Sequence, residues 1–122
     1  MDKFYAQVQE YLNMEEEIDF KEFNEYYQQV LEYLDKESAD LSEEDVWKAL
    51  FVVESIMSNA QNRAKHADTT KEQKKYKRMA KRTKLYAQHF TKRLHDAGYN
   101  DEEIGARFKE MLEEDTATAE KE

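Results

Sequence analysis

The chain has 122 residues, which suits one domain with a single modest core and is too short for two. Two glycines, no proline and 39% charged residues exclude folds that need many tight turns, so no β-sandwich or barrel is expected. The absence of cysteine excludes disulfides and thiolate chemistry. No apolar run is long enough to cross a membrane and the first residues lack the apolar stretch of a signal peptide, so we expect a soluble, cytoplasmic, acidic protein.

Two amphipathic helices are predicted in the first third of the chain. Residues 3–13 place four apolar side chains on one face, namely Phe4, Val8, Tyr11 and Leu12. Residues 19–36 begin with a capping box in which Asp19 is the N-cap, and they carry an apolar stripe made of Phe20, Phe23, Tyr27, Val30, Leu31 and Leu34. Both helices should pack through these faces.

A long antiparallel helical hairpin is predicted over residues 42–67 and 71–97. Ser42 caps its first helix, which is apolar on nearly every side as far as Met57 and then keeps only alanines at its seam. The second helix follows a capping box at Thr70 and has apolar residues at the 3.5-residue period of a coiled-coil seam: Tyr76, Ala80, Thr83, Ala87, Phe90, Leu94 and Ala97. The seam predicts that Ala87 and Phe90 are buried and that Lys77, Lys81 and Lys84 are exposed.

A last helix and a tail complete the expected fold. Gly98 stops the hairpin, Asn100 caps the next helix, and an apolar stripe follows at Ile104, Phe108, Met111 and Leu112. Residues 115–122 have no large apolar side chain and should form a disordered acidic tail. We therefore predict an all-α, up-and-down bundle of four to five helices, built as one domain over residues 1–114.

Charge is strongly segregated along the chain. The net charge is −12 over residues 1–62, +10 over residues 63–95 and −7 over residues 96–122. On a helical wheel, the basic residues of 71–97 lie opposite the seam. With two residues near the hairpin tip they form the candidate binding surface: Lys74, Lys77, Arg78, Lys81, Arg82, Lys84, Arg63 and Lys65. Such a strip can bind phosphates or an acidic partner, or it is a solvated helix face balanced by acidic neighbours.

Two further patterns allow more than one interpretation. Five tyrosines in the first two helices, with two rings of the third, form either a partner-gripping surface or the edge of the core: Tyr5, Tyr11, Tyr26, Tyr27, Tyr33, Trp47 and Phe51. Residues 94–104 loosely resemble a helix-turn-helix turn, but the helix that follows is acidic, which disfavours DNA reading.

No residue pattern indicates catalysis. The three histidines, His66, His89 and His95, do not have metal-ligand spacing, and no glycine-rich phosphate loop or nucleophile motif occurs. We therefore predict no catalytic residue, no metal and no cofactor. The sequence favours a non-catalytic protein-interaction or regulatory protein whose partner is another protein, not a membrane. The alternative is a nucleic-acid-associated protein that uses the basic outer face of the helix 71–97.

Overall fold

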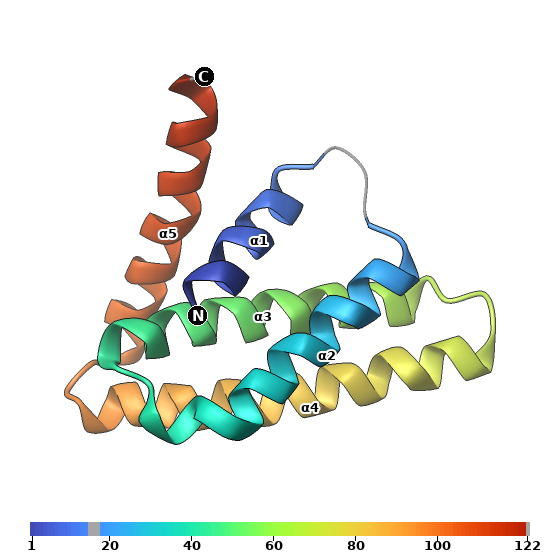
Figure 1. Cartoon of the computed structure of the whole chain (residues 1–122), viewed down its shortest axis with the longest axis horizontal. Coiled ribbons are helices and arrows are strands. Elements are labelled where there is room, and N and C mark those ends of the chain that lie inside the picture. Colours follow the sequence, from blue (N-terminus) through green and yellow to red (C-terminus); the bar gives the residue numbers. More distant parts are fainter. Residues whose placement is uncertain (15–17, 122) are drawn as a thin grey trace.

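The computed structural model describes residues 1–14 and 18–121, with side chains described as far as Leu112. This part of the chain contains five α-helices, one short 3₁₀ helix and no strand, which confirms the predicted all-α bundle (Figure 1). The elements are α1 (Asp2–Leu12), α2 (Phe20–Glu37), the 3₁₀ helix η1 (Ser38–Asp40), α3 (Glu43–Lys65), α4 (Thr70–Asp96) and α5 (Asp101–Lys121).

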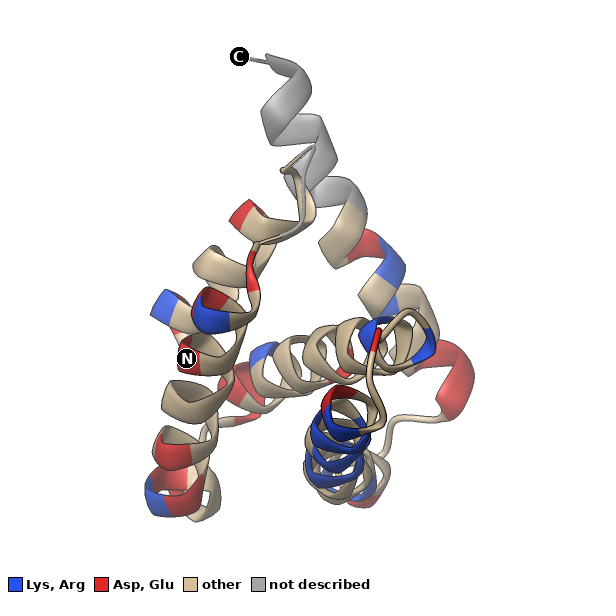
Figure 2. Cartoon of the chain, turned by 90° about the vertical axis from the view of Figure 1, so that its right-hand side faces the viewer, with Lys and Arg blue, Asp and Glu red and all other residues tan. Residues whose placement is uncertain are grey.

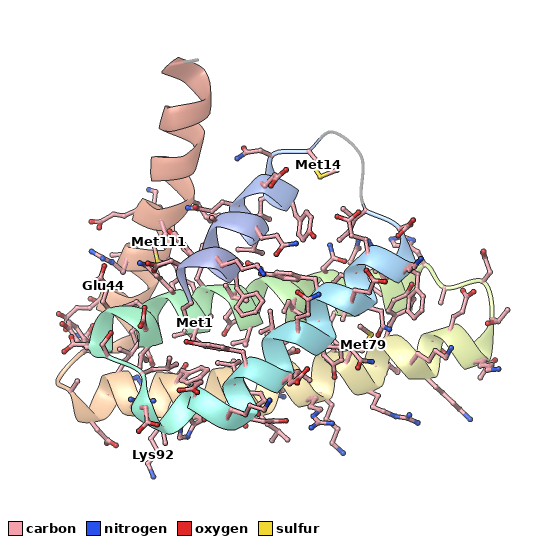
Figure 3. All side chains as sticks on the ribbon, viewed as in Figure 1. Met1, Met14, Glu44, Met79, Lys92 and Met111 are labelled. Carbon is pink, nitrogen blue, oxygen red and sulfur yellow. The ribbon has the colours of Figure 1, made fainter. Side chains whose placement is uncertain are left out.

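The antiparallel hairpin of α3 and α4 forms the base of the molecule. Its two helices lie side by side along their whole length, as predicted, whereas α2 crosses the hairpin obliquely (Figure 1). Met79 is buried where α2 passes over α4 (Figure 3). Helices α1 and α5 rise away from the first half of α3, so the second half of the hairpin is covered on fewer sides (Figure 1).

The core follows the predicted seam. Phe90 is fully buried and Ala87 is 4% exposed, whereas Lys77, Lys81 and Lys84 are exposed, which confirms that prediction. Thr83, a buried polar residue of the seam, donates its hydroxyl to backbone carbonyls one turn earlier. The seam prediction was wrong at Ala97, which is exposed because α4 ends at Asp96.

Helix starts were predicted well, with one error of register. Asp19 and Ser42 accept the expected N-cap hydrogen bonds, and Asn100 forms a reciprocal capping box with Glu103. The predicted cap at Thr70 is wrong, because Thr69 accepts from the Glu72 amide at 3.1 Å. A cap at Thr69 puts Glu72 at the third helical position, where its negative charge favours the helix dipole.

The aromatic residues of the first three helices form the core and its edge. Tyr26 and Tyr27 are buried, while Tyr5, Tyr11 and Tyr33 are half-buried, which is the arrangement expected of a core edge. Tyr26 donates a 2.7 Å hydrogen bond to the carbonyl of Phe4 and so joins α2 to α1. Leu12 was predicted to be buried but is 50% exposed, because it is the last residue of α1.

The predicted apolar stripe of the last helix is buried only in part. Leu112, predicted in the apolar stripe of the last helix, is 49% exposed, whereas Ile104 and Met111 of the same stripe are buried. The segment 115–122, for which the sequence predicts disorder, lies outside the residues whose side chains the structure describes, so that prediction stays a prediction.

Candidate binding groove on the helical hairpin

Basic side chains are concentrated on α4. Figure 2 shows lysine and arginine densest along this helix, with acidic residues on the surrounding elements. All of the predicted surface residues on α4 are exposed, as is Lys65 at the end of α3: Lys74, Lys77, Arg78, Lys81, Arg82 and Lys84. Lys92 also points away from the body of the molecule (Figure 3). The predicted strip thus lies on one helix, but its residues have different surroundings.

One edge of the strip is used inside the fold. Arg82 forms a 3.8 Å ion pair with Asp35 of α2. Arg93 donates to the backbone carbonyls of Ser38 and Leu41, which fixes the link between α2 and α3. On the side of α4 that faces α2, these basic residues therefore stabilise the fold through contacts within the chain.

Arg63, predicted to be part of the binding surface, is half-buried and makes its contacts inside the fold. Its guanidinium lies 4.7 Å from the ring centre of Phe23 and donates at 2.5 Å both to the Ile18 carbonyl and to the Asn59 side chain. These contacts hold the start of α2 against α3. The sequence could not show this, because a helical wheel gives the direction of Arg63 but not what α2 places beside it.

The other edge of the strip borders an open groove between α3 and α4, which we call the hairpin groove. Its stretch near the hairpin tip has a volume of about 720 Å³. Ala64 and Ala80 contribute to its floor, and its rim consists of lysines from both helices, Lys65, Lys77, Lys81 and Lys84. At 100° per residue, Lys77 and Lys84 lie on the opposite side of α4 from the residues that contact α2.

The groove continues toward α5. A second stretch of about 430 Å³ shares Gln61 and Lys84 with the first, so the two are continuous. Met57 and Ala87 supply apolar lining, and Glu54 is the one acidic residue among the described residues that line either stretch. Burial raises the pKa of the Glu54 carboxyl. The groove is therefore most positive near the hairpin tip and less so near α5.

The rim lysines are not neutralised by neighbours. Within the described part of the chain, none of Lys65, Lys77, Lys81 and Lys84 forms an ion pair or a side-chain hydrogen bond. Lys48, by contrast, lies 2.5 Å from Asp2, and this pairing raises the pKa of Lys48 and lowers that of Asp2. The positive potential of the groove is thus free to act on a partner. Sequence reasoning found these lysines but missed Gln61, Met57 and Glu54, which line the same groove.

A second pocket, of about 550 Å³, lies where α5 leaves α3. Its lining combines Trp47 and Tyr99 with four glutamates, and the chain's own Arg107 lies 5.9 Å from the Trp47 ring centre. The Tyr99 hydroxyl donates to Glu43, and this bond to a carboxylate raises the pKa of Tyr99. This pocket already faces a cation of its own chain.

Each of the three histidines has different neighbours. His95 Nε2 is 2.7 Å from Asp101 Oδ1, the His89 ring packs on Phe90, and His66 follows the end of α3. Among the described residues, no three histidine, aspartate or glutamate side chains are placed to hold a metal ion. The absence of a metal stays a prediction.

The fold and the groove define a helical bundle with an open, lysine-rimmed hairpin. Comparison of the chain with protein-family models, curated proteins and solved structures finds no match. No helix in the described residues combines the length and the apolar character needed to span a membrane.

Proposed function

We propose that this protein is a non-catalytic interaction protein that binds an acidic partner protein through the hairpin groove. The observation that carries the proposal is the set of four rim lysines, Lys65, Lys77, Lys81 and Lys84, which surround an apolar floor and lack ion-pair partners within the described chain. Unpaired charges of one sign speed encounter with a partner of opposite sign and select its orientation.

The floor of the groove favours a protein over a polyphosphate. Ala64, Ala80 and Ala87 form a small, nearly buried floor, and the exposed lining of the groove around them is more apolar than polar. Covering exposed apolar surface with an apolar side chain gains free energy. A phosphate backbone has nothing to place on such a floor. The chain as a whole carries a net charge of −9, which opposes the approach of a polyanion.

An affinity capture from lysate, divided into nuclease-treated and untreated halves, tests this proposal. The bait is the whole protein, beside a groove variant with Lys77, Lys81 and Lys84 changed to Glu. We expect the wild type to retain a nuclease-resistant acidic protein that the groove variant loses. A matched control carries the same charge change on exposed α4 residues outside the groove lining, Lys71, Lys74 and Arg78, and should retain the partner. Equal loss in both variants would contradict a role for the groove.

A nucleic-acid partner is the second candidate, favoured by the exposed line of basic residues along the outer face of α4. Lysines on a helix face can neutralise backbone phosphates without reading sequence. Under this candidate the captured material would disappear after nuclease treatment, and both charge variants would lose it. A cytoplasmic site of action remains part of the proposal and rests on the sequence alone.

A further inference from the structure

We infer that the hairpin groove accepts an acidic, amphipathic α-helix of the partner, which packs along α3 and α4 as an additional helix of the bundle. This inference rests on the proposed function and specifies the shape of the partner's binding segment. Three features of the described residues carry it: the shape of the groove, its length and the spacing of its charges.

The shape of the groove is that of a helix-packing site. Two antiparallel helices have a groove on each face. On one face α2 packs across the hairpin, with Phe23 and Met79 buried there. On the other face the floor is made of small residues, Ala64, Ala80 and Ala87, beyond the point where α5 leaves. Small side chains permit the close approach of a further helix, whose axis would lie about 8–10 Å from its neighbours.

The length of the groove suits a helix of ordinary size. Its lining on α4 runs from Gln73 to His95, which at 1.5 Å per residue spans about 33 Å. A partner helix of about 22 residues would fill it. A shorter helix would fill the lysine-rimmed stretch alone.

The spacing of the charges matches another α-helix. Lys77, Lys81 and Lys84 have the i, i+4, i+7 spacing that repeats once per helical turn. Carboxylates with the same spacing on a neighbouring helix of equal pitch would meet them turn by turn. An extended peptide rises about 3.3 Å per residue and does not keep this match.

The charges along the groove also indicate which half of the partner helix is more acidic. Its tip half holds four lysines and no acid among the described lining residues, whereas Glu54 faces the half near α5. The partner helix should therefore carry its acidic residues in the half that lies near the hairpin tip. Fewer acidic residues should follow toward α5, where Glu54 offsets part of the positive charge of Lys84 and Lys92.

A synthetic probe tests the inference. The probe is a fluorescein-labelled helical peptide of about 22 residues, with alanine and leucine along one face and glutamates at i, i+4 and i+7 in one half. Gln61→Trp fills the middle of the groove without changing its charge, and Gln29→Trp places the same ring on an exposed position of α2. We expect fluorescence anisotropy to show binding to the wild type, at least about tenfold weaker for Gln61→Trp and within about twofold for Gln29→Trp. Circular dichroism of each variant checks that it folds.

The outcomes separate the inference from the proposed function. A scrambled peptide of the same composition should bind at least about tenfold more weakly than the probe, because it has no apolar face. Equal binding of the scrambled peptide, or no effect of Gln61→Trp, would overturn the inference that the partner binds as a helix. Either result would leave the proposal of an acidic partner unaffected. No binding of the probe at all would also overturn the inference of a helical partner. The proposed function is tested separately, by the capture from lysate.

Discussion

Basic residues of one helix have different roles in this protein, and the difference lies in what packs beside each. Arg82 is paired with Asp35, whereas Lys77 and Lys84, on the other side of α4, have no partner in the described chain. A guanidinium can also pack on a ring, as Arg63 does on Phe23. Residue type and helical direction were predictable, but the neighbour depends on how α2 crosses the hairpin.

Phe90 is the residue on which the hairpin core depends most. Phe90 is fully buried, and its ring stacks with the ring of Tyr86 at a distance of 6.2 Å between ring centres. Phe90→Ala should lower the free energy of unfolding by about 3–5 kcal/mol, because it removes apolar contact and leaves a cavity. Urea denaturation followed by circular dichroism measures the change. A loss below about 1 kcal/mol would contradict the core described above.

Glu54 should make stability depend on pH. Burial raises its pKa above the ordinary 4.5, so the folded protein binds this proton more tightly than the unfolded chain. The charged carboxylate therefore disfavours folding near neutral pH, and this effect is lost as the pH falls through the folded-state pKa to below the unfolded value. Glu54→Gln should raise the melting temperature near neutral pH, by an amount that shrinks at about pH 4.

The exposed Glu25 provides the control for this measurement. Glu25→Gln removes the same charge from the surface of α2 and should change the melting temperature little at any pH. A gain from Glu54→Gln that is independent of pH would show that burial of the charge is not its cause.

At the scale of elements, the helices and their caps were predictable because their signals are local. A cap needs residues three positions apart and a seam needs one period, and both occur within single segments. The sequence also indicates the position of the groove in part, because the residues on the two sides of the α4 seam differ. The side facing α2 carries Met79 and Tyr86, whereas the groove side carries Lys77 and Lys84. What no local signal provided was the depth of the groove or the presence of Glu54 in it, because these require α3 and α4 to be docked.

The start of α4 gives an element-scale prediction. Thr69→Ala should cost about 1 kcal/mol of stability, because it removes the side-chain oxygen that accepts from the Glu72 amide. Thr70→Ala removes a similar hydroxyl from the first helical position and should cost at most about 0.5 kcal/mol. Thermal or chemical denaturation of the two variants ranks them. A larger loss of stability for Thr70→Ala than for Thr69→Ala would show that Thr70 is the N-cap.

At the scale of the whole molecule, the arrangement of helices explains why one face stays open. Helix α2 packs across one side of the hairpin, and α1 and α5 cover the first half of α3 before rising away from it (Figure 1). The second half of the hairpin keeps its lysine rim exposed around a floor of small, nearly buried alanines. Acidic elements surround this basic region, so the molecule presents opposite charges on different faces (Figure 2).

This charge distribution predicts weak binding of nucleic acid. At physiological salt the Debye length is about 8 Å, so the strip on α4 acts at short range, while the overall charge of −9 opposes approach. Binding of mixed-sequence duplex DNA should be detectable by anisotropy at low salt, should fall steeply as salt rises through counterion release, and should disappear when Lys74, Arg78 and Lys81 are changed to Glu. These three residues lie away from the seam and are exposed, so the variant should fold. Submicromolar binding of wild-type protein near physiological salt, lost in the variant, would instead make phosphate the natural partner of the strip, because a locally paired or merely solvated helix face gives no such affinity.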